Sequence, residues 1–283
     1  MKIRANGTFT SAKARVWGLV AVMGMALAVT GCAGMGAKDV KYIERLVEEI
    51  YNTALKELQK GRYFQAAEQF DEVERQHPYS VWARRSMLMA AYSNYQINEY
   101  DKAILAAQRF ISLHPGNRDV VYAYYLVAIS YYEQISDVGR DQKITAEALR
   151  ALTEVVRRFP TSDYARDARL KIDLTNDHLA GKEMEIGRYY LKQHEYLAAI
   201  NRFRIVVESF QTTSHVPEAL HRLTESYVAL GIIDEAQSAA AVLGYNYPGS
   251  DWYQDSYSLL TGKNIRPVEN KKSWISRAFG GIS

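Results

Sequence analysis

The sequence has little cysteine and none of the short motifs that mark the common enzyme classes. Cys32 is the only cysteine among 283 residues, which excludes an intrachain disulfide and a zinc site made of several thiolates. No glycine-rich phosphate loop, GxSxG nucleophile elbow or HExxH metal motif occurs. We therefore expect a protein that is not an enzyme, without catalytic residues, a metal site or a cofactor.

Long apolar runs are equally scarce. The uncharged stretch at residues 16–30, VWGLVAVMGMALAVT, is short for a membrane span. It follows a region that holds basic residues and no acidic ones, as the apolar core of a signal peptide does. We therefore predict that residues 1–31 are a signal peptide.

The apolar stretch ends in Val29-Thr30-Gly31-Cys32, which resembles a bacterial lipobox with valine in place of the usual leucine. A lone cysteine is usually a buried structural thiol, but the place of Cys32 directly after the signal core favours a lipid-modified N-terminus. The resemblance implies a covalent lipid on Cys32, and two or more acyl chains anchor a protein stably. Because Ala33 follows, and not the aspartate associated with inner-membrane retention, it also implies the periplasmic face of a Gram-negative outer membrane.

Charge of neither sign dominates the chain, which has 35 basic and 32 acidic residues. Basic residues outnumber acidic ones in the signal segment and in residues 263–283, so the region 32–262 is net acidic. An acidic body argues against nucleic acid as a partner. We expect the basic tail, residues 263–283, to be disordered. Contact with anionic lipid is one alternative, and a short amphipathic segment with Trp274, Ile275 and Phe279 is another.

What the sequence does contain is a five-residue pattern that recurs five times. Its members stand at relative positions 0, 3, 7, 10 and 15, and positions 3, 7 and 10 mark one face of an α-helix. The small residue at position 3 permits close approach of another helix, and the proline lies past the helix end. The copies are Tyr63-Ala66-Phe70-Val73-Pro78, Tyr100-Ala103-Ala107-Phe110-Pro115, Thr145-Ala148-Leu152-Val155-Pro160, Tyr196-Ala199-Phe203-Val206-Gln211 and Ile233-Ala236-Ala240-Leu243-Pro248.

A second regularity marks where the following helices begin. Two residues after each terminal position stands a residue of the type that caps a helix N-terminus, namely Ser80, Asn117, Ser162, Thr213 and Ser250. Each unit is therefore expected to end one helix, turn and begin the next. Two insertions interrupt the period: one in the turn around residues 137–143, and one after Pro160, where Gly181 indicates a helix break.

The pattern resembles the tetratricopeptide repeat, whose second helix carries alanine, an aromatic residue and a turn proline. We predict an all-α fold, a right-handed solenoid of about five such helix pairs over residues 40–262. A helix from Ser250 to Leu260 would close it, and residues 32–39 would be a short lipidated tether. An irregular helical bundle is the alternative, but two independent regularities argue against it.

Tyrosine is abundant, with 21 residues. The first helices of tetratricopeptide pairs line the concave face, and the phase of the repeat places there Tyr51, Arg85, Tyr92, Tyr95, Tyr122, Tyr125 and Tyr132. Tyrosine combines broad apolar contact with a hydroxyl group at low entropic cost. Packing between repeats is the alternative for each ring, but the set favours a groove that binds an extended or aromatic-ended peptide.

Two further stretches carry a more specific resemblance. Gly139-Arg140-Asp141-Gln142 in the third repeat and FPTSDYARDARLKI at residues 159–172, with the lipobox and the five repeats, are similar to the BamD (ComL) family. These are lipoproteins of the outer-membrane β-barrel assembly (BAM) complex. The resemblance covers nearly the whole mature chain, but not the tail after Leu260.

The resemblance implies a non-catalytic subunit with three kinds of contact. Its N-terminal repeats would bind C-terminal segments of unfolded outer-membrane proteins, and these segments alternate aromatic and apolar residues. Its C-terminal repeats would dock on the POTRA region of the core subunit BamA, near other lipoproteins of the complex. Its lipid would hold it on the membrane.

Two arginines of the fourth repeat are candidates for the docking contact. Arg188 and Arg202 stand on predicted helices of this repeat, and an arginine fork suits a carboxylate on a partner domain. A solvated surface charge is the alternative for each. The alternative function is an outer-membrane lipoprotein adaptor that scaffolds peptidoglycan hydrolases. A pull-down separates the two functions by recovering either a POTRA-bearing protein or cell-wall enzymes.

We predict that Cys32 is the acylated mature N-terminus, because it directly follows the apolar run and is the only cysteine. Mass spectrometry of the protein from membranes should find a first residue at Cys32 that carries acyl chains. A mature N-terminus at any other residue, with Cys32 as a free thiol, contradicts this prediction.

Overall fold

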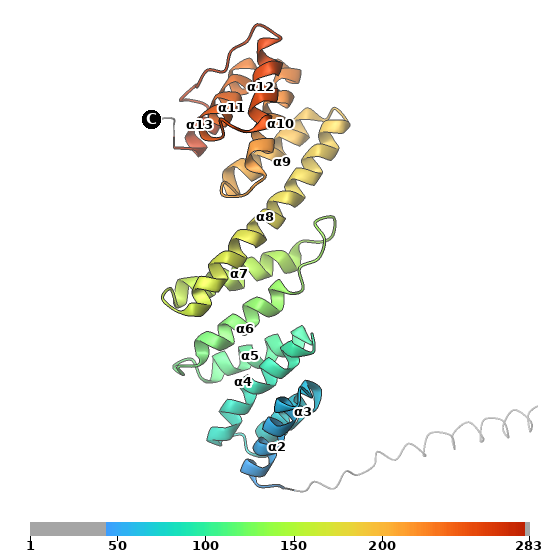
Figure 1. Cartoon of the computed structure of the whole chain (residues 1–283), viewed down its shortest axis with the longest axis vertical. Coiled ribbons are helices and arrows are strands. Elements are labelled where there is room, and N and C mark those ends of the chain that lie inside the picture. The colour runs from blue at the N-terminus through green and yellow to red at the C-terminus, as the bar shows by residue number, and fades with distance from the viewer. Residues whose placement is uncertain (1–43, 281–283) are drawn as a thin grey trace, which may run out of the picture. The chain divides into compact units, whose positions relative to one another are not determined.

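The structure is a computed structural model that describes residues 44–280 (Figure 1). The predicted signal peptide, Cys32 and the tether lie outside the described residues. Within residues 44–280 the chain forms helices and no strands, which confirms the predicted all-α class. In chain order the helices are α2 (Val47–Gln59), α3 (Tyr63–Gln76), α4 (Val81–Gln96), α5 (Tyr100–Leu113), α6 (Val120–Tyr132), α7 (Lys143–Arg158), α8 (Asp163–Lys192), α9 (Tyr196–Ser209), α10 (Val216–Leu230), α11 (Ile233–Asn246), α12 (Asp251–Thr261) and α13 (Trp274–Ala278).

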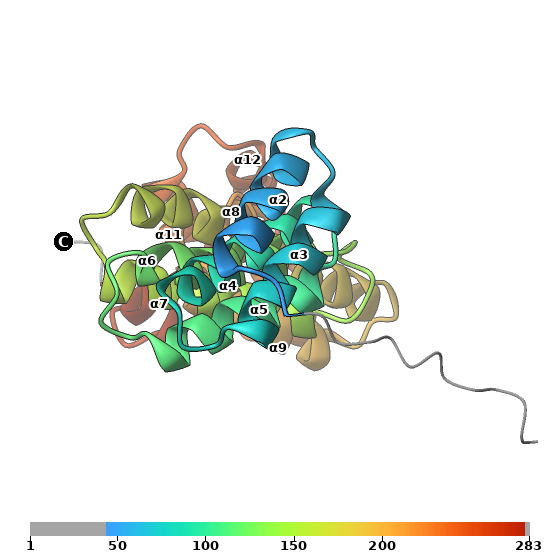
Figure 2. The same cartoon turned by 90° about the horizontal axis from the view of Figure 1, so that it is seen from below.

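Helices α2 to α11 form five consecutive pairs, as the repeat predicts. Each helix packs against the one before and the one after it. In addition, α2 contacts α4, α4 contacts α6, and α6 contacts α8, so these first helices of the pairs share one surface. We call this surface the first-helix face. Figure 2 views the helices from the α2 end, with α2 and α3 in front of the later pairs.

The repeated sequence positions form the core between neighbouring helices. The residues at relative positions 3, 7 and 10 are buried in all five copies, from Ala66, Phe70 and Val73 in α3 to Ala236, Ala240 and Leu243 in α11. Burying one of the phenylalanines stabilises the fold by about 1.5–3 kcal/mol. The prolines of the pattern lie just past the ends of α3, α5, α7 and α11. The repeat and its phase are therefore confirmed.

Three of the five predicted helix caps are confirmed. The hydroxyl groups of Ser80, Ser162 and Ser250 accept hydrogen bonds from backbone N–H groups at the starts of α4, α8 and α12. The prediction is wrong for Asn117 and Thr213, because α6 and α10 begin later than expected. Their side chains instead bond within the preceding turns: Asn117 accepts from the Asp119 backbone, and Thr213 donates to the Phe210 carbonyl.

The predicted helix break at Gly181 is wrong, because α8 runs unbroken over 30 residues. A glycine costs a helix only about 1 kcal/mol relative to alanine. Ala180 and Met184 on either side of it are fully buried in the core shared with α9, and this packing outweighs that cost. Gly181 leaves room for the ring of His215, because a Cβ at this position would stand 3.3 Å from that ring.

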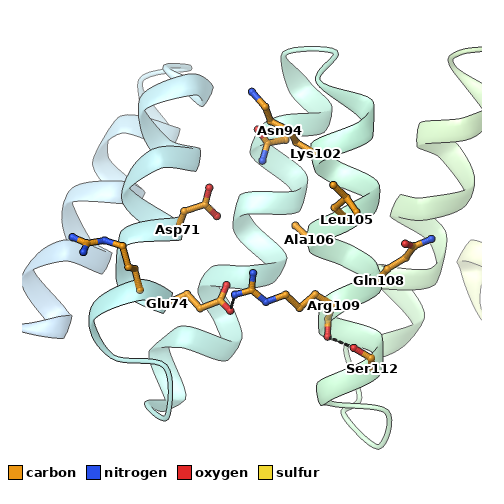
Figure 3. Close-up of a pocket in the computed structure, with 10 residues that line it drawn as sticks. Asp71, Glu74, Asn94, Lys102, Leu105, Ala106, Gln108, Arg109 and Ser112 are labelled. Carbon is orange, nitrogen blue, oxygen red and sulfur yellow. Dashed lines mark hydrogen bonds and ion pairs between the residues drawn. The ribbon is translucent and has the colours of Figure 1, made fainter. Parts of the chain in front are cut away.

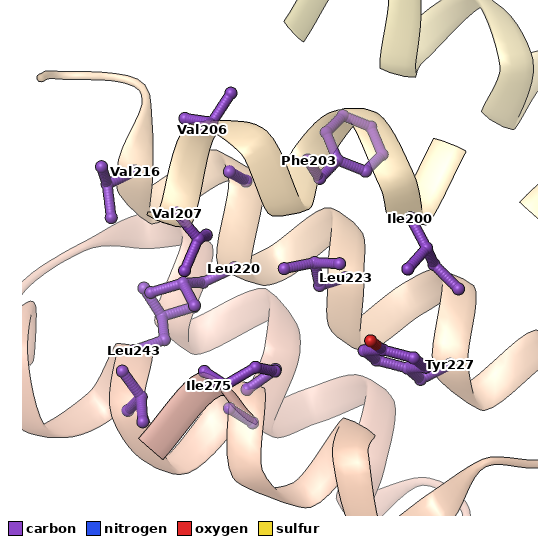
Figure 4. Close-up of a cluster of buried hydrophobic side chains, with 14 of the residues drawn as sticks. Ile200, Phe203, Val206, Val207, Val216, Leu220, Leu223, Tyr227, Leu243 and Ile275 are labelled. Carbon is purple, nitrogen blue, oxygen red and sulfur yellow. The ribbon is translucent and has the colours of Figure 1, made fainter. Parts of the chain in front are cut away.

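The chain closes with two short helices. The predicted closing helix is confirmed as α12, which packs on α10 and α11. The prediction of a disordered tail is wrong for α13, because this helix packs against α9 and α11. Ile275 is fully buried there (Figure 4), and the Trp274 indole donates to the Tyr227 hydroxyl at 3.0 Å. Two adjacent apolar residues thus hold the tail on the fold.

Among residues 44–280, no helix combines the length and the apolar character that crossing a lipid bilayer requires.

Replacing Gly187 by alanine is expected to destabilise the protein. A Cβ there would stand 2.4 Å from the fully buried ring of Phe203, and overpacking of this kind costs about 1–3 kcal/mol. Thermal unfolding followed by circular dichroism should show a lower melting temperature. The matched control is Gly249→Ala, where a Cβ meets no atom within 4 Å. A Gly187→Ala variant as stable as the wild type contradicts this account of the α8–α9 contact.

Candidate functional site

Tyrosine side chains gather on the first-helix face, where α4, α6 and the start of α8 lie together. The ring of Tyr164 lies 5.5 Å from that of Tyr122 and 4.9 Å from that of Tyr125. Tyr92 and Tyr95 of α4 lie close enough to raise the pKa of Tyr122 further, beyond the larger effect of burial. We call these five residues the tyrosine cluster. Four of them are among the predicted groove residues.

The rings of the cluster pack on one another and are also accessible. All five are partly exposed, so each offers part of its surface to a ligand. The two interpretations of the tyrosines, packing between repeats and ligand contact, therefore both apply. Tyrosine rings suit this double use because their faces are apolar and their hydroxyl groups are polar.

The hydroxyl groups of the cluster act as hydrogen-bond donors. Tyr125 donates to Asp167 of α8 at 2.5 Å, and Tyr95 donates to Glu133 at 3.4 Å. Burial raises the pKa of Tyr95 to about 12, with a further contribution from Glu133. Burial also raises the pKa of Tyr125, and the hydrogen bond to Asp167 raises it further. Both hydroxyl groups therefore keep their protons at neutral pH.

A charged pair on α8 borders the cluster. Lys171 forms an ion pair with Asp167 at 3.2 Å, and its ammonium group lies 5.3 Å from the centre of the Tyr132 ring. Burial alone would raise the pKa of Asp167, but the hydrogen bonds from Tyr125 and Lys171 outweigh it and leave the pKa lowered. Asp167 is therefore ionised at neutral pH and orients the Tyr125 hydroxyl. Tyr132, predicted as a groove residue, lies at this edge of the cluster.

Two predicted groove residues, Tyr51 and Arg85, lie apart from the cluster and line a cavity of about 760 Å³. The cavity lies where α4 begins and where the turn before α6 passes, at residues 116–119. Tyr51 is only 8% exposed and packs against Phe70 and Trp82, so its ring is mainly structural. Arg85 is exposed, with its guanidinium group 5.7 Å from the centre of the Trp82 ring.

The sequence interpretation missed Tyr164 and Asp167, because the insertion after Pro160 obscured the phase of the repeat. The sequence does contain a pattern that locates both residues. Trp82 and Tyr164 each stand two residues after a capping serine, and Arg85 and Asp167 each stand five residues after one. Aligning the caps as well as the alanines predicts that α8 contributes to the first-helix face.

The two arginines predicted for docking both form ion pairs within the chain. Arg188 holds Glu218 of α10 with two hydrogen bonds, at 2.8 and 2.6 Å. These bonds raise the pKa of Arg188. Arg202 of α9 donates one hydrogen bond to Glu183 of α8 at 3.1 Å, and its side chain remains 38% exposed. Arg188 thus joins two helices through Nε and Nη2, whereas Arg202 donates through one nitrogen, Nη1.

The loop with Arg140, Asp141 and Gln142 connects α6 to α7, where the first insertion is predicted. Gln142 organises this loop: its amide donates to the backbone carbonyl of Arg140 at 3.0 Å and accepts from the Thr145 hydroxyl at 2.8 Å. Asp141 accepts from the Lys143 backbone. Arg140 is exposed. The loop therefore has a fixed shape that presents Arg140 to solvent.

A larger cavity, of about 980 Å³, lies on α3, α4 and α5 (Figure 3). Its lining is charged with both signs, and Glu74 of α3 forms an ion pair with Arg109 of α5. Burial raises the pKa of Asp71 in its wall. Two acidic and three basic side chains line it, so this cavity does not select a ligand of one charge. In the described part of the chain no cluster of side chains is arranged to hold a metal ion.

Comparison with known proteins identifies the family. A solved tetratricopeptide-repeat protein from Thermus thermophilus aligns with 18% identity and a TM-score of 0.36, over 76% of this chain and 100% of its own. The family described as outer membrane lipoprotein, YfiO, matches residues 44–243. Outer membrane protein assembly factor BamD of Caulobacter vibrioides is 54% identical over 260 residues, 91% of this chain and 85% of that protein. Its namesake in Rickettsia prowazekii is 46% identical over 242 residues, 86% of this chain and 96% of that protein. The chain belongs to the BamD (YfiO) family of outer-membrane lipoproteins.

Proposed function

We propose that this protein is a non-catalytic, lipid-anchored subunit of the β-barrel assembly machinery on the periplasmic face of the outer membrane. Membership of a family whose relatives are named outer membrane protein assembly factors supports the role in assembly. The tyrosine cluster is the observation that supports a direct contact with substrate. A lipid on Cys32 would place the helices close to the membrane into which barrels are inserted.

The proposed ligand of the cluster is the C-terminal segment of an unfolded outer-membrane protein. Such a segment is extended and alternates aromatic with apolar residues. The partly exposed rings offer stacking surfaces for the aromatic side chains. The protonated hydroxyl groups of Tyr95 and Tyr125 are already held by carboxylates. Their remaining acceptor capacity suits backbone N–H groups, which are the same in every substrate.

The proposed second contact joins the C-terminal helices to the POTRA region of a BamA-type subunit. Arg202 supports this part of the proposal, because its guanidinium group is partly exposed on a rigid helix and has donors left for a partner carboxylate. Arg188 is the weaker candidate, since Glu218 occupies its fork. Other lipoproteins of the complex are proposed as further partners.

Substituting tyrosines of the cluster is expected to weaken peptide binding and leave the fold intact. The probe is a synthetic peptide of about ten residues, the length of one membrane strand, ending in an aromatic residue. Fluorescence anisotropy should show that Tyr95→Ala and Tyr125→Ala each raise the Kd about three- to tenfold, as expected for the loss of an aromatic contact. Tyr125→Phe, which keeps the ring and removes the hydroxyl group, should have a smaller effect.

The matched control is Tyr245→Ala, because Tyr245 is exposed on α11, away from the cluster. It should bind the peptide as the wild type does. Circular dichroism should show the same helical content in every variant. Unchanged affinity in both alanine variants rules out the cluster as the peptide site, and unfolding of both would mean that the rings serve the core alone.

Changing Arg202 to glutamate is expected to weaken recovery of the POTRA-bearing partner from detergent-solubilised membranes. The change removes a positive charge and places a second carboxylate beside Glu183. Removing one member of an interfacial charge pair costs about 2–5 kcal/mol, so recovery should fall at least tenfold. Arg150→Glu on α7 is the control, since Arg150 pairs only with Glu147 of its own helix among described residues. If Arg202→Glu recovers as much partner as Arg150→Glu, Arg202 lies outside the docking surface.

A further inference from the structure

We propose that the 760 Å³ cavity at the start of α4 binds the terminal α-carboxylate of the substrate peptide, together with its last side chain. This inference rests on the proposed function and adds the direction in which the peptide binds. The C-terminus of the peptide would lie at the cavity, and the preceding residues would extend toward the tyrosine cluster. Three kinds of observation carry it: the charge of the cavity, its apolar lining and the order of residues along α4.

The charge of the cavity is positive and largely uncompensated. Three basic side chains, Arg84, Arg85 and Arg118, line it against one carboxylate, that of Asp119. Arg118 forms an ion pair with Asp119, but its side chain is 94% exposed, and such pairs contribute little. Arg84 and Arg85 form no ion pair with any carboxylate in residues 44–280, and the Arg85 guanidinium group lies 5.7 Å from the centre of the Trp82 ring.

A second pair of adjacent arginines shows that the absence of a carboxylate partner at Arg84 and Arg85 is unusual in the described residues. Arg157 and Arg158 of α7 both form ion pairs with Glu154. In the described residues, arginines on this protein's helices usually meet a carboxylate of the same or the neighbouring helix, as Arg109 and Arg188 do. Arg84 and Arg85 have no such carboxylate partner and line a cavity, so they can bind a carboxylate of another molecule.

The remaining wall of the cavity is polar at Asn117 and Asp119 and otherwise has an apolar and aromatic lining. Tyr51, Leu88 and Phe110 contribute to it. Burial raises the pKa of Tyr51, while the charge of Arg85 acts in the opposite direction, so the guanidinium field reaches the Tyr51 hydroxyl. An aromatic or large apolar side chain would fill the lined space, and its attached carboxylate would meet the arginines. A lipid phosphate shares the charge but lacks the single side chain that this wall fits.

The order of residues along α4 gives the direction. Arg85, Leu88, Tyr92 and Tyr95 follow one another at helical spacing on one stripe. The path from Arg85 to Tyr95 is about 15 Å at 1.5 Å per residue. An extended peptide covers that distance in about five residues, and alternate side chains point to the same side. A terminal residue in the cavity would thus place the third and fifth residues from the end against the tyrosine rings.

The test compares two peptides of one sequence that differ only at the C-terminus, a free acid and an amide. The full mature lipoprotein in detergent is titrated with each. The wild type is expected to bind the free acid about ten- to a hundredfold more tightly, since hydrogen bonds to a charged group are the stronger kind. In the double variant Arg84→Gln, Arg85→Gln, this preference should disappear, with both peptides binding as the amide binds to the wild type.

The matched control is the double variant Arg157→Gln, Arg158→Gln, which also removes two adjacent charges and should keep the preference for the free acid. A third peptide, lengthened by two glycines, moves the carboxylate away from the aromatic residue and should bind like the amide. Phosphatidylglycerol added to the same detergent micelles provides the lipid control, and it should not compete with the peptide.

Equal affinity of the wild type for acid and amide overturns the carboxylate site while leaving peptide binding by the tyrosine cluster in place. Competition by phosphatidylglycerol would overturn it in favour of a lipid headgroup. Failure of the wild type to bind either peptide overturns both this inference and the proposed substrate contact. The comparison of peptides on the wild type needs no variant, so a folding defect in the arginine variant does not affect it.

Discussion

Close packing at the repeated alanines is the constraint on which the rest of the structure depends. Ala66, Ala103, Ala148, Ala199 and Ala236 are fully buried, and at each of them a second helix approaches its neighbours more closely than a larger side chain would allow. With the second helices fixed in this way, the first helices must lie side by side, and α2, α4, α6 and α8 contact one another in series. The first-helix face is therefore a consequence of the core. Its side chains pack between repeats and remain partly exposed, so they can also serve recognition.

Helix α8 links the two regions to which function is assigned. Its first turns contribute Tyr164 and Asp167 to the tyrosine cluster, and its later turns hold Glu183 and Arg188 against α9 and α10. An unbroken helix of 30 residues is about 45 Å long. Small and flexible apolar side chains fit it to its neighbours toward both ends: Ala165 and Ala168 are fully buried near its start, and Ala180 and Met184 farther along. The distance between a bound substrate segment and the docked partner would then be set by one helix.

The sequence predicts the core better than the surface, for a physical reason. Burial repeats in each pair, so the spacing of small and aromatic residues suffices to locate the helices and all the repeated core positions. A glycine is ambiguous by comparison: Gly181 indicates a break when its low helix propensity is considered alone, yet neighbouring burial keeps α8 intact. Local spacing also cannot show that Arg188 meets Glu218 or that Ile275 fills a gap between α9 and α11. These contacts join residues far apart in the chain and depend on how helices that are distant in sequence pack together.

A binding surface for unfolded barrel proteins has to accept many sequences in one orientation, and the chemistry of the first-helix face suits this requirement. Tyrosine rings accept any aromatic or apolar side chain, and hydroxyl groups with raised pKa values stay neutral, so they place no charge requirement on the bound segment. Neutral contacts of this kind do not distinguish the two directions of an extended chain. The uncompensated arginines at the start of α4 supply the missing asymmetry, because a chain has a carboxylate at only one end. Under this proposal, general affinity and fixed direction come from separate parts of the same face: the tyrosines hold the segment, and the arginines orient it.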